Sequence, residues 1–326
     1  MSTLKAEILS VLAGRPGQYF SGGALADQFN VSRNAVWKAI RQLQTEGYAI
    51  DGITNKGYAL TSDGNIISEA CIRHDLTARI FGRKIRIYPE LDSTNSAAKA
   101  LADQEDAHGT VIIADSQSGG RGRYGRPFFS PKKSGIYMSL FLRPSLKAEQ
   151  ALMITSCAAV AVAEAIEKLY PVNVQIKWVN DLYVNQRKVC GILTEAGIGF
   201  ENGQLDYVVI GIGVNTGAVT FPKDLAPIAT SLENETGIAV SRNRLIAEIL
   251  NSLESRFETM TDGSFLQESR RRSILLGREI LVISANETYP AKAIDIDSHG
   301  FLIAETANGR VSLNSGEVSI RLSPSK

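Results

Sequence analysis

The sequence contains few of the residues that build disulfide frameworks or zinc sites. Its 326 residues include only three cysteines, Cys71, Cys157 and Cys190, and three histidines. The cysteines are odd in number, far apart and outside any CxxC or Cys/His spacing. This pattern argues against both kinds of site and is typical of a reducing compartment, so we expect a cytoplasmic location.

Long apolar segments are also missing. The N-terminal stretch MSTLKAEILSVLAG lacks the apolar core and the small-residue cleavage site of a signal peptide. The most apolar run, Ala151–Ala163, has 13 residues, whereas a membrane-spanning helix needs about 20. The sequence therefore predicts no membrane partner, and we expect this run to be a buried helix.

Neither sign of charge dominates. Thirty-five Lys and Arg balance 34 Asp and Glu, for a net charge of +1. Without a global basic field, any nucleic-acid binding must come from a local patch. A hydrophobic content of 44% is typical of a folded protein, and the length predicts two or three domains.

Residues 1–65 have the pattern of short helices followed by a hairpin. Ser32 is suited to cap a helix over residues 32–46, and Gly47 is suited to end it. The apolar residues of this helix share one face, at Val36, Ile40 and Leu43. The following stretch YAIDGITNKGYAL predicts two strands around a turn. This order of elements predicts a winged helix-turn-helix.

The remaining faces of that helix are polar and basic. If the domain binds DNA, the N-terminal half of the helix enters a major groove and reads base edges, while the wing contacts phosphate. The DNA-binding candidates are Ser32, Arg33, Asn34, Trp37, Lys38 and Arg41 on the helix and Lys56 on the wing. The same pattern also fits a protein-contact module with a solvated basic face.

Two further segments follow, and together the three predict an α+β protein. Over residues 66–275 strands alternate with helices, which predicts a central mixed α/β domain. Over residues 276–326 short strands are separated by turn sequences such as DSHG and ANG, which predicts a small SH3-like β-barrel.

The stretch GGRGRYGRPF, residues 119–128, is the first candidate site. Between Ser116 and Ser134 the chain has five Lys or Arg and no acid. Glycines let backbone N–H groups approach an anion closely, and Arg can hold carboxylate or phosphate with two hydrogen bonds. It is neither a Walker A loop nor a GxGxxG helix start. Its place between two strands favours a structured anion-binding loop over a disordered RGG segment.

The stretch KWVNDLYVNQRK, residues 177–188, is the second candidate. Lys177 and Lys188 could neutralise a phosphate, and Asn180 and Asp181 could hold Mg²⁺ through oxygen ligands. Taken alone, the Asn-Asp pair slightly favours an ordinary turn, in which this dipeptide is common.

The stretch LDSTN, residues 91–95, is the third candidate. Ser93 or Thr94 could cap a helix. Two hydroxyls and an amide at a helix N-terminus could also form a small polar ligand pocket.

Five motifs together carry a family resemblance. DSTN, QSGGRGRYGRPF, KWVNDLY, RKVCGILTE and GIGVN occur in this order between the expected winged helix and barrel. The set resembles the bifunctional biotin–protein ligase/biotin operon repressor family of the BirA type, over essentially the whole chain. One departure is Val179, where the family often has proline in KWPND. The change removes a fixed φ angle but no functional group.

The resemblance implies a two-step reaction and a second role in transcription. Biotin and ATP, with Mg²⁺, give biotinyl-5′-AMP, and an acceptor lysine of the biotin carboxyl carrier protein of acetyl-CoA carboxylase then takes the biotinyl group. A homodimer with bound biotinyl-AMP is implied to bind biotin operator DNA and repress the operon.

The resemblance also implies roles for individual residues. Lys188 and Arg123 are the implied catalytic residues, and Asn180 and Asp181 are the implied Mg²⁺ ligands. The implied biotin-binding residues are Ser93, Thr94, Asn95, Gln117, Arg121, Gly122, Arg123, Lys188 and Gly191. The implied nucleotide-binding residues are Arg123, Lys177, Asn180, Asp181 and Asn215.

From the residues alone, an alternative function that is not enzymatic stays open. A non-enzymatic winged-helix regulator with a small-molecule sensor domain would need the same anion-binding loop but no chemistry.

Overall fold

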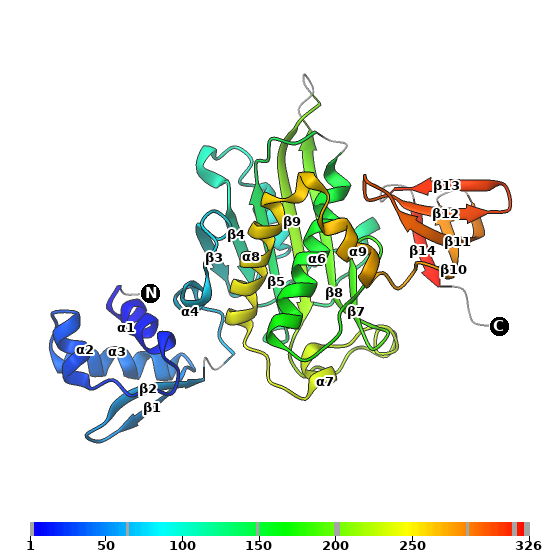
Figure 1. The fold of residues 1–326 in the computed structure, drawn as a ribbon. Helices are drawn as coiled ribbons and strands as arrows, with labels where there is room; N and C mark the ends of the chain where they lie inside the picture. The colour runs from blue at the N-terminus through cyan, green and yellow to red at the C-terminus, as the bar shows by residue number, and fades with distance from the viewer. Residues whose placement is uncertain are drawn as a thin grey trace. The chain divides into compact units, whose positions relative to one another are not determined.

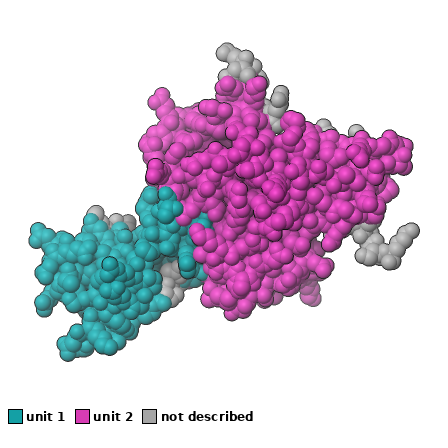
Figure 2. Space-filling view, viewed as in Figure 1, with its two compact units in different colours: residues 1–77, 241–248 teal, residues 78–240, 249–326 magenta. Residues whose placement is uncertain are grey.

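The computed structural model describes residues 3–62, 65–147, 150–198, 203–284, 287–314 and 318–322. The chain divides into two compact units, residues 1–77 with 241–248 and residues 78–240 with 249–326 (Figure 2). Across these described ranges, no helix combines the length and apolarity needed to cross a membrane.

The first unit is a helical bundle followed by a two-stranded hairpin. Its elements are α1 (Thr3–Gly14), α2 (Gly22–Gln28), α3 (Arg33–Thr45), β1 (Ala49–Ile53), β2 (Gly57–Ser62) and α4 (Glu69–Asp75) (Figure 1). The Ser32 hydroxyl caps α3 by accepting the N–H of Ala35 at 3.1 Å. Val36, Ile40 and Leu43 are buried in the core of this unit. The predicted helix-turn-helix and hairpin are therefore confirmed, and α4 is an addition to the predicted elements.

The hairpin is tied to the segment before α2. Phe20 and Tyr58 form an isolated antiparallel bridge, in which each N–H donates to the other residue's carbonyl at 2.9 Å. Gly57, next to this bridge, has a φ of +104°, and a Cβ there would lie 2.0 Å from the Phe20 carbonyl oxygen. The wing can therefore reach the helices only because residue 57 has no side chain.

A seven-stranded mixed sheet forms the centre of the second unit. Its order is β3-β4-β5-β9-β8-β7-β6, with β3 parallel to β4 and the other neighbours antiparallel. The strands are β3 (Lys84–Tyr88), β4 (Thr110–Ala114), β5 (Gly135–Leu142), β6 (Gln175–Lys177), β7 (Asp181–Val184), β8 (Arg187–Ile198) and β9 (Leu205–Asn215). Together with its helices, this sheet confirms the predicted mixed α/β class.

Helices cover both faces of this sheet. Helix α5 (Thr94–Lys99) packs on β4, β5 and β9, and α6 (Ala151–Leu169) packs on β6, β7 and β8. Asn95 of α5 contacts Glu195, whereas Thr155 of α6 lies 2.8 Å from Thr194. Neighbouring strand residues point to opposite faces, so α5 and α6 lie on opposite sides. The predicted helix over 151–163 is confirmed and buried.

Three more helices and three short 3₁₀ turns complete the regular helical structure of the described chain. The helices are α7 (Leu232–Thr236), α8 (Arg242–Glu258) and α9 (Phe265–Arg272), and the 3₁₀ turns are η1 (Glu105–Ala107), η2 (Arg123–Gly125) and η4 (Met260–Asp262). Arg256 of α8 pairs with Glu164 of α6. The peptide bond between Trp178 and Val179, at the departure from the family motif, is cis.

The C-terminal strands form a separate five-stranded antiparallel sheet in the order β13-β12-β11-β10-β14. They are β10 (Glu279–Ser284), β11 (Thr288–Ile296), β12 (Leu302–Thr306), β13 (Gly309–Leu313) and β14 (Val318–Leu322). The predicted short strands are confirmed. Among the described residues β13 and β14 do not pair, so the sheet is open and the predicted barrel closure is not seen.

The wing contact predicts different outcomes for two glycines that both have positive φ. We expect Gly57→Ala to destabilise the first unit by about 3 kcal/mol, because its Cβ meets backbone. Gly17→Ala is the matched control: φ is +79° but no atom lies within 4 Å of the added Cβ, so about 1 kcal/mol is expected. Hydrogen exchange across residues 3–62 measures both, and equal effects would contradict the steric account.

Candidate active site

A cavity of about 790 Å³ opens on the α5 face of the large sheet. Its wall combines the N-terminus of α5, the arginine–glycine loop, the ends of the central strands and the segment before α7. Every predicted biotin or nucleotide residue lies on this wall: Ser93, Thr94, Asn95, Gln117, Arg121, Gly122, Arg123, Lys177, Asn180, Asp181, Lys188, Gly191 and Asn215. Residues from all five motifs thus meet at one place.

Glycines form the floor of the cavity. Gly191 of β8 pairs with Gly213 of β9, and Leu193 pairs with Gly211. A Cβ on Gly213 would lie 2.5 Å from the Phe128 ring, and one on Gly211 would lie 2.1 Å from Asn95 Oδ1. The ring and the amide can therefore approach the sheet this closely only because these strand positions have no side chain.

One end of the cavity is polar and uncharged. Ser93 caps α5, with its hydroxyl 3.4 Å from the Ser96 N–H. Gln117 accepts the Thr94 N–H through Oε1 at 2.8 Å and donates through Nε2 to Ser130 at 3.1 Å. These bonds orient the Gln117 amide. The two interpretations of LDSTN, a helix cap and part of a ligand pocket, are compatible, because Ser93 caps α5 and also lines the cavity.

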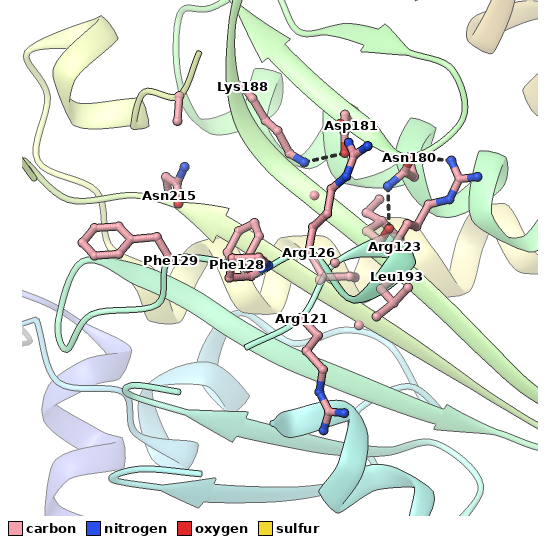
Figure 3. Close-up of a pocket in the computed structure, with 18 of the residues that line it drawn as sticks. Arg121, Arg123, Arg126, Phe128, Phe129, Asn180, Asp181, Lys188, Leu193 and Asn215 are labelled. Carbon is pink, nitrogen blue, oxygen red and sulfur yellow. Dashed lines mark hydrogen bonds and ion pairs between the residues drawn. The ribbon is translucent and has the colours of Figure 1, made fainter. Parts of the chain in front are cut away.

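The other end of the cavity is charged. Lys188 Nζ lies 2.6 Å from Asp181 Oδ1, and Arg123 Nη1 donates to Asn180 Oδ1 at 3.2 Å (Figure 3). Asp181 begins strand β7 and Asn180 Nδ2 donates to the Ile192 carbonyl at 3.0 Å, so this pair is built into the sheet. Burial, with a smaller contribution from Asp181, raises the pKa of Tyr183 on the same wall to about 12. That phenol stays neutral and can donate a hydrogen bond.

The arginine–glycine loop folds back on itself. The Gly122 N–H donates to the Arg126 carbonyl at 2.7 Å and the Phe128 N–H to the Gly120 carbonyl at 2.9 Å. Arg123 turns toward Asn180, whereas Arg121 points away from the charged end and donates to the Ser96 hydroxyl at 3.0 Å (Figure 3). The two predicted arginines therefore occupy different surroundings.

The loop tip carries an exposed aromatic side chain. Tyr124 has a φ of +58° and is 57% exposed. Its hydroxyl accepts from Arg123 Nη2 at 3.1 Å, and the Arg123 guanidinium lies 5.1 Å from the ring centroid. Tyr124 therefore helps to hold Arg123 in its position over the cavity.

A segment outside the large sheet supports the charged end. The Lys188 N–H donates to the Ile228 carbonyl at 2.9 Å, and Asn215 Nδ2 donates to the Thr230 carbonyl at 3.0 Å. Glu235 binds Thr230 and Arg187 through Oε1. Burial alone would raise the pKa of Glu235, but hydrogen bonds from its neighbours lower it. Asn215 thus anchors this segment through its hydrogen bond to Thr230.

Metal-binding groups are sparse. The described part of the chain contains no group of three His, Cys, Asp or Glu able to hold a metal ion. All three cysteines are buried, and burial raises the pKa of Cys157 to about 12 and also raises that of Cys190. These two thiols stay protonated near neutral pH and are poor ligands or nucleophiles.

The DNA-binding candidates lie on the first unit. Ser32 is the N-cap of α3, and Arg33, Asn34, Lys38 and Arg41 are exposed on that helix. Trp37 is 47% exposed, with the Arg41 guanidinium 5.6 Å from its ring centroid. Lys56 lies in the exposed turn of the hairpin. The structure thus presents the predicted residues on the surface.

Comparison with known proteins identifies the family. Residues 88–215 match the biotin/lipoate A/B protein ligase family, residues 5–59 match an HTH domain, and residues 275–321 match the biotin protein ligase C-terminal domain. The bifunctional ligase/repressor BirA of Bacillus subtilis is 35% identical over 326 residues, covering 98% of this chain and 99% of that protein. The chain belongs to the biotin protein ligase family. The resemblance predicted from the motifs is therefore confirmed.

Other members of the biotin protein ligase family extend this comparison. The bifunctional ligase/repressor BirA of Escherichia coli is 27% identical over 325 residues, covering 98% of each chain. A biotin protein ligase from Aquifex aeolicus in complex with biotin and ATP superposes with a TM-score of 0.65 and 27% identity, covering 74% of this chain and 100% of that one.

Several wall residues of this biotin protein ligase were missed in the sequence. Phe128 and Arg126 lie in the quoted loop motif, and Gly211 and Gly213 are the two glycines of GIGVN. The alternating glycines on a β-like run were the available signal, because glycine inside a strand often marks close approach by another group. Ile228, in the supporting segment, has no comparable signal.

Proposed function

We propose that this chain is a biotin–[biotin carboxyl carrier protein] ligase that also represses transcription of the biotin operon. The ligase reaction forms biotinyl-5′-AMP from biotin and ATP and transfers the biotinyl group to a lysine of the carrier protein of acetyl-CoA carboxylase. Support comes from membership of the family and from the names of full-length relatives, which join ligase and repressor.

The observation that carries the proposal is the division of the cavity into two ends. A neutral hydrogen-bonding wall at Thr94 and Gln117 faces one end, and Lys188 and Arg123 face the other, with a glycine floor between them. Biotin has the matching division: a neutral ureido ring at one end and a carboxylate at the other. The carboxylate is thus delivered to the cationic end, where the nucleotide is bound.

In the first step a biotin carboxylate oxygen attacks the α-phosphorus of ATP. A bond forms between that oxygen and phosphorus, the bond to the bridging oxygen breaks, and pyrophosphate leaves with the electron pair. Both reactants are anionic, so their approach requires cations. Lys188 lies against the attacking carboxylate and the α-phosphate, and Arg123 with the loop N–H groups stabilises charge that develops on the phosphoryl oxygens.

Asn180 and Asp181 fit a Mg²⁺ ion that arrives with ATP. They present one carboxylate and one amide oxygen at the charged end, and Mg²⁺ is typically held by one or two carboxylates with waters and phosphate oxygens. When bound, the ion supplies charge neutralisation for the phosphates. Asp181 Oδ1 contacts Lys188 and Asn180 Oδ1 contacts Arg123, so Lys188 and Arg123 would have to move before these oxygens could hold the ion.

In the second step the carrier lysine attacks the acyl carbon of biotinyl-AMP. The amide bond forms, the acyl–phosphate bond breaks, AMP leaves and the amine loses a proton. Until that encounter the mixed anhydride must be kept from water. The arginine–glycine loop, with the exposed Tyr124 at its tip, covers it.

Repression uses the first unit as a reader of DNA. A homodimer with bound biotinyl-AMP places two α3 helices on a two-fold biotin operator. The chain works in the cytoplasm as three domains: residues 1–65 bind DNA, residues 66–275 carry out catalysis, and residues 276–326 form a small C-terminal β domain. Family matches at residues 5–59, 88–215 and 275–321 support this division.

A non-enzymatic regulator that only senses a small molecule is not favoured, because the family match covers the ligase domain itself. Release of pyrophosphate when biotin and MgATP are added together separates the two functions. A carrier domain then becomes labelled on its lysine if the full reaction occurs.

Lys188→Ala should lower the rate of biotinyl-AMP formation by about 10²–10³, because one cation at the reacting phosphate is lost. Pyrophosphate release in single-turnover conditions measures this rate. Lys292→Ala, at an exposed lysine of β11 that does not line the cavity, is the control and should leave this rate unchanged. Equal rates in both variants would remove Lys188 from the mechanism.

Arg123→Gly should release biotinyl-AMP into solution faster than the parent protein, by about tenfold or more. Its guanidinium contacts Asn180 over the charged end, and one charged hydrogen bond is worth about 1.5–3 kcal/mol. Arg121→Gly, on the same loop but turned toward Ser96, should release less. Chasing preformed radiolabelled adenylate measures both rates; faster release from the Arg121 variant would reverse the assignment.

Lys38→Ala should weaken operator binding several-fold and reduce the salt dependence by about one phosphate contact. Arg73→Ala is the control, because Arg73 is exposed on the same unit but pairs with Glu69 on α4. Gel shifts at several salt concentrations, with biotin and ATP present, measure both. If the salt dependence of operator affinity is unchanged in Lys38→Ala, Lys38 does not contact the DNA.

A further inference from the structure

A hydrogen-bonded row of side chains runs behind the polar wall of the cavity. Thr94 and Asn95 line the cavity, whereas Ser139 is fully buried behind them. Glu195 lies beyond Asn95 and does not line the cavity. The row joins α5 to β5 and β8, so its members are held by three separate elements.

Glu195 fixes the orientation of the Asn95 amide. Asn95 Nδ2 donates to Glu195 Oε2 at 2.8 Å and to the Leu193 carbonyl at 3.2 Å. Lys99 Nζ lies 2.8 Å from the other Glu195 oxygen. Burial alone would raise the pKa of Glu195, but hydrogen bonds from Lys99 and Asn95 outweigh it and lower the pKa. An anionic carboxylate only accepts, so the Asn95 nitrogen must face it and Oδ1 must face Ser139.

Asn95 in turn fixes the direction of the Ser139 hydroxyl. Ser139 Oγ lies 2.6 Å from Asn95 Oδ1 and 2.8 Å from Thr94 Oγ1. An amide oxygen can only accept, and Ser139 has one proton, so that proton is committed to Asn95. Toward Thr94, Ser139 can act only as an acceptor.

The Thr94 proton is then directed into the protein. Its two acceptors there are Ser139 Oγ at 2.8 Å and Gln117 Oε1 at 3.2 Å. With either partner, the Thr94 oxygen presents lone pairs to the cavity. A ligand group that meets this oxygen must therefore be a donor, and the ureido ring of biotin carries such N–H groups.

We propose that Glu195 is a positioning residue for biotin, which acts through Asn95 and Ser139 to keep the Thr94 hydroxyl an acceptor for a ureido N–H. This inference rests on the proposed function. It also changes the role of Asn95: both of its N–H donors are used inside the protein, so it orients the wall and does not donate to biotin.

Glu195→Gln tests the donor–acceptor direction of the hydrogen bonds in this row. Lys99 holds the amide oxygen of the new side chain, so its NH₂ group faces Asn95 and forces that amide to turn round. Ser139 then donates to Thr94, which occupies a lone pair of the Thr94 oxygen and leaves the Thr94 proton only the longer contact to Gln117 Oε1 at 3.2 Å. The Thr94 hydroxyl is then a poorer acceptor for the ureido N–H. Calorimetry on the full chain should show that biotin binds about tenfold more weakly. The KM for ATP, measured by pyrophosphate release, should be unchanged.

A double-mutant cycle with Thr94→Val separates positioning from general destabilisation. Without the Thr94 hydroxyl there is nothing for Glu195 to orient, so Glu195→Gln should cost less than about twofold in that background. Glu167→Gln is the matched control, because Glu167 pairs with the buried Arg272 away from the cavity. It should lower the melting temperature and leave biotin affinity unchanged.

The same tenfold loss in both backgrounds, or unaltered affinity in Glu195→Gln, would overturn the inference. If Glu195→Gln does not fold, as judged by circular dichroism, Ser139→Ala takes its place in the cycle with the same expected non-additivity. Biotin binding without pyrophosphate release would reject the ligase reaction alone, because the cycle is measured by binding. Failure of the unaltered chain to bind biotin would reject both.

Discussion

The absence of a side chain at Gly211 and Gly213 of strand β9 is the constraint on which the site depends. A Cβ at residue 211 would overlap Asn95, and one at residue 213 would overlap the Phe128 ring. Without these glycines the loop and α5 could not both rest on the sheet, and the polar and charged ends would not share one cavity. The arrangement of the site therefore depends on strand positions that have no side chain.

This floor also positions the loop that carries the three arginines. Phe128, at the end of the loop, lies on the glycines, and the loop closes on itself through Gly122 and Arg126. Mutual repulsion among the arginines is reduced because their side chains diverge: Arg121 reaches Ser96 and Arg123 reaches Asn180. Packing of one aromatic ring thus opposes the electrostatic tendency of the loop to open.

The local elements were predictable from sequence because they follow local rules. Ser32 caps α3 as predicted, and the five motifs led to the family, which the comparisons confirm. Long-range geometry was not predictable. Nothing in the stretch KWVND indicates that Lys188 would meet Asp181 across a β7–β8 turn, or that Asn95 would use both donors on Glu195 and Leu193. Such pairings depend on strand register, which residue types alone do not specify.

The two ends of the cavity differ in how firmly they are built, and this difference suits the proposed order of events. Thr94 and Asn95 are 4% and 7% exposed and are held by hydrogen bonds within the protein that any ligand finds already formed. At the charged end Lys188 contacts Asp181, so an internal carboxylate offsets its charge until an external one arrives. A ligand carboxylate or phosphate that takes over Lys188 leaves Asp181 available to a cation. A ligand can therefore bind at the neutral end before Lys188 and Asp181 exchange partners at the charged end. In this order the charges of Lys188 and Asp181 stay paired throughout.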